Sequence, residues 1–257
     1  MSASTTTLEL ARVEYALRLG DDALILGQRL GEWCGSAPTL ELELGLANLG
    51  LDLIGQAQLF LGVAGEREGR GRDADELAYH RDVYDFRNCL LVEQPNGDFA
   101  RTIARQFLFS TWQRALFERV ATAPDERLAE IARKAVKEVS YHVRLAGDWV
   151  IRLGDGTEES HRRMVDGLAW SWRSVDELFL ADPKLAPLVA TGEAVDLPAL
   201  RGSWDAEVAA VLAKATLAVP KATRLTLSGR HGRHSEHLGH ILAELQFLQR
   251  TYPGASW

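Results

Sequence analysis

Cysteine is almost absent from this 257-residue chain, which contains only Cys34 and Cys89. Two cysteines are too few for a disulfide framework or for a zinc site built from thiolates. The first residues, Met1 to Thr7, contain neither a basic segment nor an apolar stretch, so they predict no secretory signal. These absences favour the reducing cytoplasm as the location of the protein.

Long apolar runs and common catalytic patterns are also lacking. No run approaches the roughly 20 apolar residues that a membrane-spanning helix needs, so we expect no membrane span. A net charge of -7 argues against non-specific binding to nucleic acid or to an anionic membrane. The chain has no glycine-rich phosphate loop, no nucleophile elbow and no paired cysteine and histidine. The chemistry, if any, must come from another arrangement.

What the chain does contain is helical periodicity. The eight prolines lie between long windows in which apolar residues recur every three or four positions, and no window alternates as a strand would. The sequence predicts an all-α fold: a ferritin-like four-helix bundle with additional C-terminal helices, in a single domain of residues 1–257. The predicted helices cover about 8–33, 39 to past 60, 98 to before 124, 128–153, 158–179, 200–217 and 234–252, with loops at 65–75 and 183–198.

The stretch from Lys137 to His142 looks like a di-iron ligand motif that has lost its glutamate. A carboxylate-bridged di-iron site in a helical bundle uses Glu-x-x-His, which places the carboxylate and the imidazole one turn apart. Here His142 is present, but Val139 stands three residues before it. Because an apolar side chain cannot bind a hard cation, this pattern indicates a bundle without its metal.

The one literal Glu-x-x-His is Glu158 to His161, directly after a Gly-Asp-Gly-Thr turn. Acidic residues in the first turn of a helix complement its dipole, so we interpret this stretch as a helix start rather than a metal site.

The C-terminal region contains histidines spaced by three, and Glu236 and His240 form an i,i+4 pair that could hold a transition metal. Gly232 and Gly239 weaken a continuous helix here, so we favour surface or capping histidines. The histidines are His231, His234, His237 and His240.

Two sequence blocks are distinctive: Val-Glu-Gln-Pro-Asn-Gly at residues 92–97 and Glu-His-Leu-Gly at residues 236–239. Together with further blocks along nearly the whole chain, they resemble the C subunit (PaaC) family of bacterial phenylacetyl-CoA epoxidase, also called ring 1,2-epoxidase. The further blocks are Leu17–Asp21, Gln28–Gly35, Ala47–Ala57 and Thr102–Gln106, and the two distinctive blocks lie within the longer matches Leu91–Gly97 and His234–Gly239.

The resemblance implies a ferritin-like fold and a non-catalytic role beside a homologous A subunit that carries the iron. The ligand motif of that A subunit can be placed on this chain, where one ligand of six survives. His142 is then expected to be a core histidine bonded to Gln56, Gln106 or a water. The six positions of this degenerate site are Ala23, Leu53, Gln56, Gln106, Val139 and His142.

The family also implies partners and a substrate. Its A and C subunits work with a B subunit and a reductase E subunit, and the complex inserts one oxygen atom of O2 into the aromatic ring of phenylacetyl-CoA. This chain would stabilise the A subunit and bind no cofactor itself. We also expect a contact with the phosphate or pantetheine of the CoA thioester at Asp85, Phe86, Arg87 and Asn88, because arginine suits phosphate; a solvated loop is the alternative.

Two other interpretations remain open at this point. One is a free-standing ferritin-like di-metal oxidase with unconventional ligands, drawn from Glu32, Asp52, Glu138 and His142. The other is a homodimeric helical scaffold unrelated to oxygenation.

Overall fold

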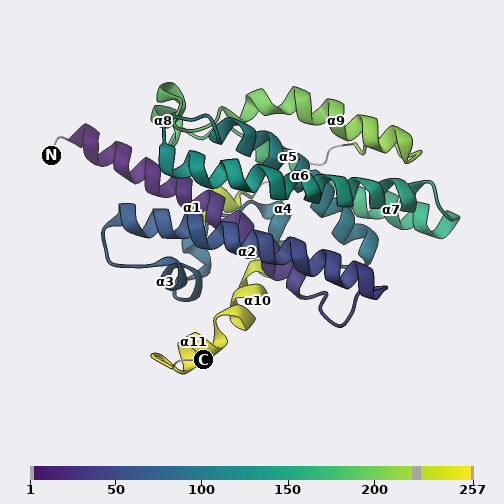
Figure 1. Ribbon diagram of the computed structural model, residues 1–257, viewed down its shortest axis with the longest axis horizontal. Coiled ribbons are helices and arrows are strands. Elements are labelled where there is room, and N and C mark those ends of the chain that lie inside the picture. Colours follow the sequence, from purple (N-terminus) through teal and green to yellow (C-terminus); the bar gives the residue numbers. More distant parts are fainter. Residues whose placement is uncertain (1–2, 222–226, 256–257) are drawn as a thin grey trace.

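The computed structural model describes residues 3–221 and 227–255, and these ranges contain helices but no strand (Figure 1). The predicted all-α fold is confirmed; the ends of the predicted single domain, 1 and 257, lie outside the described residues. The α-helices are α1 (Ala3–Gly31), α2 (Leu40–Glu68), α3 (Ala74–Tyr79), α4 (Leu90–Glu93), α5 (Phe99–Val120), α6 (Glu126–Gly154), α7 (Glu158–Trp172), α8 (Ala186–Thr191), α9 (Arg201–Lys214), α10 (Glu236–Leu245) and α11 (Phe247–Thr251). Short 3-10 helices are η1 (Val83–Asp85), η2 (Val175–Phe179), η3 (Leu197–Leu200) and η4 (Gly229–His231).

The four long helices α1, α2, α5 and α6 form the bundle. Helix α1 packs along α2, α5 packs along α6, and α2 meets α6 where the two pairs join. Helices α7 and α9 cover the α5–α6 pair, and α10 leads away from the α1–α2 side (Figure 1). Large apolar side chains such as Phe60, Phe107 and Trp112 fill the space between the pairs and are buried. The predicted bundle with additional C-terminal helices is therefore present.

Local capping signals explain why the long helices begin where the sequence predicts. The Thr39 hydroxyl accepts a hydrogen bond from the Leu42 N–H at 3.4 Å, and α2 starts at the next residue. Asp98 accepts a bond from the Arg101 N–H at 2.9 Å and starts α5 in the same way. Such contacts lie within one turn of the chain, so sequence alone can reveal them.

Helix α7 confirms the interpretation of the Glu-x-x-His stretch as a helix start. Thr157 is its N-cap and shares a capping box with Ser160. The Glu159 carboxylate bonds to Arg162 and Arg163 on the next turn, and His161 Nδ1 lies 2.7 Å from the Gly154 carbonyl oxygen. These contacts give Glu159, Ser160 and His161 partners within the helix and its preceding turn.

Several predicted boundaries were wrong. The fifth helix ends at Trp172 rather than 179, and the chain continues as η2. The C-terminal helix is broken between α10 and α11 at Gln246, whose side chain donates to the carbonyl oxygens of Ala78 and Arg81. Helices α3, α4 and α8 were missed because four to six residues are too few to show a period.

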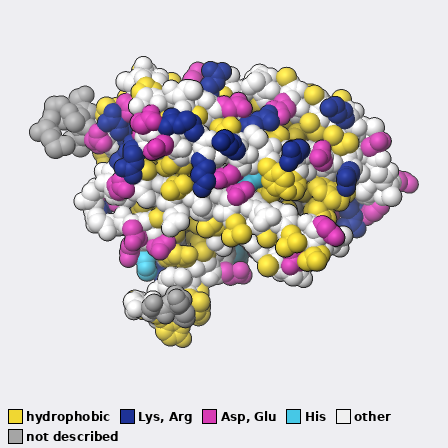
Figure 2. Space-filling model, viewed as in Figure 1, with side chains coloured by type: hydrophobic (Ala, Val, Ile, Leu, Met, Phe, Trp, Pro, Cys, Tyr) yellow, Lys and Arg dark blue, Asp and Glu magenta, His cyan; other side chains and the backbone are white. Residues whose placement is uncertain are grey.

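Among the described helices, only α2 is long and apolar enough, by length and composition, to cross a membrane. The expectation that no segment approaches such a length is therefore wrong for α2. Half of its most apolar stretch is buried inside the protein. The other half faces outward, and Figure 2 shows hydrophobic side chains gathered on the right of this view, over α2 and neighbouring α6.

Candidate functional site

The six positions predicted to form a degenerate site are distributed over the four long helices of the bundle. Each of α1, α2, α5 and α6 contributes at least one of them. All six side chains are at most 2% exposed, so the inward positions read from the periodicity are buried. They are Ala23, Leu53, Gln56, Gln106, Val139 and His142.

His142 bonds to a partner that the sequence analysis did not name. Its Nε2 lies 3.1 Å from Asp52 Oδ2, whereas Gln56, Gln106 or a water had been expected. The reason is geometric: Asp52 and Gln56 lie one turn apart on the side of α2 that meets α6, and Asp52 is the one level with His142. Asp52 remains 35% exposed, so the buried imidazole is linked to the surface through one carboxylate.

The glutamines of the centre bond to other groups. Gln56 Nε2 donates to Glu138 Oε2 at 2.9 Å, and its Oε1 accepts from Gln113 Nε2 at 3.2 Å. Gln106 Nε2 donates to Ser110 Oγ at 2.8 Å. Amide side chains thus join α2 to α5 and α6 at the level where a metalloenzyme of this architecture would have carboxylates.

This donor set does not fit a pair of ferrous ions. A ferritin-like di-iron site uses four carboxylates and two histidines, but Ala23, Leu53 and Val139 present only hydrocarbon. In the part of the chain that the structure describes, no group of three or more His, Cys, Asp or Glu side chains could hold a metal ion. Of the unconventional ligands, Glu32 bonds instead to Arg29 and Asn96, at 2.7 and 2.8 Å.

The pKa of His142 makes the bundle centre sensitive to pH. Burial lowers this pKa, and Asp52 and then Glu138 offset part of the shift. The unfolded chain therefore takes up a proton at His142 before the folded protein does, and stability is lost as pH falls below about 6.5. We expect the free energy of unfolding to fall more steeply from about pH 7 to about pH 5 in the wild type than in His142→Gln. Urea denaturation at several pH values measures both slopes, and equal slopes would contradict the prediction.

A second buried polar cluster joins three parts of the chain: α1, the segment 80–98 between α3 and α5, and the C-terminal region around Arg230. Arg230 Nη2 donates to Asp22 Oδ2 at 2.6 Å, and both side chains are less than a tenth exposed. The other Asp22 oxygen accepts from the Cys89 N–H at 2.7 Å, while burial raises the pKa of the Cys89 thiol. On the preceding residue, Asp21 Oδ2 accepts from Arg81 Nη1 at 3.0 Å. Residues more than 200 positions apart are thus joined by one ion pair.

Glu93 brings together the two sequence blocks that carry the family resemblance. Its carboxylate lies 2.7 Å from His234 Nδ1 and accepts bonds from the Ser235 N–H at 2.6 Å and from Asn88 Nδ2 at 2.9 Å. The two blocks therefore fold against each other. No signal in the sequence pairs two positions that lie 141 residues apart.

The C-terminal histidines do not share one helix face. Helix α10 begins at Glu236, so His231 and His234 precede it. The prediction of a surface or capping role is wrong for His234, whose side chain is 1% exposed against Glu93. His231 and His240 are exposed, as predicted.

The candidate CoA contact at residues 85–88 is mostly turned inward. Phe86 and Asn88 are fully buried, while Asp85 is exposed. The Arg87 guanidinium donates to Glu14 and to the Tyr84 carbonyl oxygen, at 3.2 and 2.7 Å. A CoA phosphate would have to compete with these partners for Arg87, and the contact stays a prediction.

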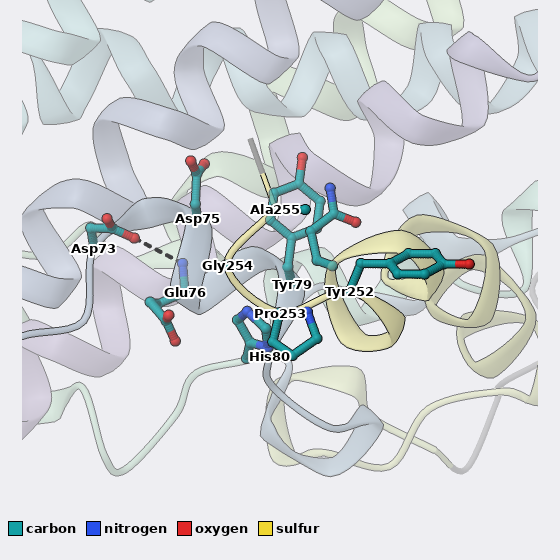
Figure 3. Close-up of a pocket in the computed structure, with 10 residues that line it drawn as sticks. Asp73, Asp75, Glu76, Tyr79, His80, Tyr252, Pro253, Gly254 and Ala255 are labelled. Carbon is teal, nitrogen blue, oxygen red and sulfur yellow. Dashed lines mark hydrogen bonds between the residues drawn. The ribbon is translucent and has the colours of Figure 1, made fainter. Parts of the chain in front are cut away.

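Two hollows on the protein surface lie apart from the six bundle-centre residues. One, of about 400 Å³, lies between α3 and the C-terminal segment; Figure 3 shows Asp73, Asp75 and Glu76 on one side of it and Tyr252 on the other. Asp73 caps α3 by accepting from the Glu76 N–H at 2.9 Å, so this carboxylate has a structural role. A second hollow, of about 550 Å³, is mainly apolar and is lined by residues 180–197 around α8. None of the six bundle-centre residues lines either hollow.

Comparisons with known proteins agree with the sequence blocks. The model of a family described as phenylacetic acid catabolic protein matches residues 2–257. The chain is also 51% identical over 243 residues to the C subunit of 1,2-phenylacetyl-CoA epoxidase from Escherichia coli (strain K12). That alignment covers 95% of this chain and 98% of the relative, so the predicted resemblance is confirmed over nearly the whole length.

Proposed function

Because the chain belongs to the phenylacetic acid catabolic protein family, with its ferritin-like helical fold, we propose that it is the non-catalytic structural subunit of a phenylacetyl-CoA 1,2-epoxidase. In this role it pairs with a homologous A subunit that carries the di-iron centre. The complex also contains a B subunit and a reductase E subunit, and it acts in aerobic phenylacetate degradation in the cytoplasm. It places one oxygen atom of O2 on the aromatic ring of phenylacetyl-CoA.

The bundle centre is the observation that carries this proposal. Two Fe(II) ions bring four positive charges, which a protein interior tolerates only when carboxylates neutralise them. Here the aligned positions hold three hydrocarbon side chains, two amides and one histidine. The oxygen chemistry of the complex is therefore assigned to the partner, and this chain supplies a bundle that needs no metal to hold its shape.

The remaining polar groups support the same role. Gln56 joins α2 to α5 and α6 through Gln113 and Glu138, and the His142–Asp52 pair adds a second link between α2 and α6. Hydrogen bonds between helices in the places of metal–ligand bonds keep the helices in register. A bundle whose helices are joined in this way can serve as a scaffold for a partner subunit.

Iron content and complex formation test the proposal together. We expect the chain expressed alone to contain far less than one iron per polypeptide. Co-expressed with a homologous A subunit, it should form a complex that contains both chains and iron. Elemental analysis and native mass spectrometry of the same preparations measure both quantities.

Two results would reject the proposal. Near-stoichiometric iron in the isolated chain, lost in His142→Ala, would favour the free-standing oxidase. A stable homodimer that ignores the A subunit would favour the unrelated scaffold. His240→Ala is the matched control for the first result, because His240 is exposed and lies outside the bundle centre.

A further inference from the structure

The outward side of α2 is unusually apolar for an exposed helix. Its leucines Leu40, Leu44, Leu51 and Leu59 are 69%, 57%, 70% and 43% exposed. Between Leu44 and Gly62, Asp52 is the only charged residue. We call this side the α2 outer face, and it consists of Leu40, Leu44, Ala47, Asn48, Leu51, Gly55, Gln58, Leu59 and Gly62, which recur at spacings of three or four.

The backbone of the α2 outer face is open to close approach. A Cβ atom added at Gly55 or Gly62 would meet no atom within 4 Å. These glycines also cost helix stability, on the order of 1 kcal/mol each relative to alanine. Because glycine has no side chain, Gly55 and Gly62 leave a groove between the exposed leucines. Side chains of a second helix can pack into this groove.

Helix α6 extends the apolar surface beyond α2. Tyr141 is 38% exposed, and Leu145 lies against Gly45 of α2, with 3.4 Å between the Leu145 side chain and an added Cβ. Figure 2 shows the hydrophobic side chains of α2 and α6 as one patch on the same side of the molecule. The α2 outer face together with Tyr141 and Leu145 is called the α2–α6 face.

The size of this face indicates what kind of occupant it fits. From Leu44 to Gly62 a helix rises about 27 Å, and its outward side is roughly 10 Å wide. A stable protein interface buries about 800 Å² per partner, more than one helix side offers. An occupant that buries this much area has to cover α2 and α6 together, which favours a folded helical protein over a single peptide.

Charges on the α2–α6 face specify the chemistry of the occupant. Asp52 and Glu138, 35% and 21% exposed, lie where α2 meets α6. Glu138 accepts from Gln56 and lies 3.7 Å from Lys134 Nζ. Asp52 has His142 but no lysine or arginine as a partner among the described residues. A partner that covers Asp52 must present Arg or Lys, because burying a carboxylate without a cation costs several kcal/mol. Lys137 on α6 is exposed and favours an acidic group on the facing surface of the partner. A bilayer fits poorly, since both carboxylates would enter an apolar medium.

We propose that the α2–α6 face is the surface through which this chain binds the homologous iron-carrying A subunit; this inference rests on the proposed function. Pairing with a second copy is disfavoured by the charge of Asp52. A twofold axis through the middle of the face would bring Asp52 close to its own copy. A partner of different sequence can present basic groups there.

The test uses a leucine that is exposed in the free chain, so that folding is not at risk. Leu51→Glu is co-expressed with the A subunit and compared with Leu51→Met and with Leu10→Glu, a leucine 64% exposed on α1. We expect Leu51→Glu to weaken binding at least tenfold, and both other variants to bind like the wild type. Thermal unfolding of each isolated variant should match the wild type. Affinity is measured by surface plasmon resonance on the immobilised A subunit.

Each other outcome overturns the inference in its own way. If the wild type and Leu51→Glu bind the A subunit equally well, the surface is wrong and the proposed function stands. If the wild type does not bind the A subunit, the proposed function fails and this inference with it. A wild-type homodimer that Leu51→Glu dissociates would assign the face to a second copy. Flotation with phosphatidylglycerol vesicles, lost in Leu51→Glu, would assign it to a membrane.

Discussion

Replacing Arg230 by methionine is expected to lower the free energy of unfolding by about 3–5 kcal/mol, the usual cost of leaving a buried charge without its partner. Arg230 is the counter-ion of Asp22, and its other terminal nitrogen donates to the Arg87 carbonyl oxygen at 3.0 Å. Methionine keeps much of the side-chain volume but leaves the Asp22 carboxylate with one N–H donor, that of Cys89. Urea denaturation of the isolated chain measures the loss.

Two comparison variants separate the charge effect from loss of packing. Arg230→Met combined with Asp22→Asn should recover part of the loss, because no unpaired charge then remains. Arg162→Met removes an exposed arginine that bonds to Glu159 and Asp166, and it should change stability by less than about 1 kcal/mol. A loss in Arg162→Met equal to that in Arg230→Met would refute this account of the buried cluster.

Restoring one missing ligand without the others is expected to harm the fold. Val139→Glu places a carboxylate in the bundle centre, where Val139 is fully buried. The cost is on the order of 3–5 kcal/mol, because the ionised group has no cation and few donors around it. The folded-state pKa of the new glutamate should be raised, so the loss should grow as pH rises above about 4.3. Denaturant titrations at acidic and neutral pH measure this change.

Controls for this substitution are available on the same helix. Val139→Gln introduces a side chain of nearly the same shape as glutamate but without its charge. Its loss of free energy of unfolding should therefore depend little on pH. Ser140→Glu adds the same carboxylate one residue later, where the side chain is exposed, and should be nearly neutral. A stable Val139→Glu protein with no pH dependence would mean that the centre is polar enough to hold ions, contrary to the donor set described above.

The helices and the inward positions could be predicted because their causes are local. Amphipathic periodicity places Ala23, Val139 and His142 on buried stripes, and Thr39 and Asp98 start α2 and α5 through bonds to residues three positions on. The family resemblance was equally accessible, since it depends on the order of residues within short blocks. Short helices such as α8 were missed because one or two turns carry too few residues to show a period.

Contacts between distant segments could not be predicted in the same way. His142 bonds to Asp52 because α6 lies beside α2 at one particular register, and His234 is buried because its loop closes on Glu93. Periodicity predicts Leu53 on the inward side of α2, and the structure confirms this, but periodicity does not reveal that the outward Leu51 stays exposed. Spacing along the chain decides which side chains share a helix side, because that depends on backbone geometry alone. Which sides then meet depends on how the helices pack in three dimensions, and that arrangement leaves α2 with an exposed apolar side.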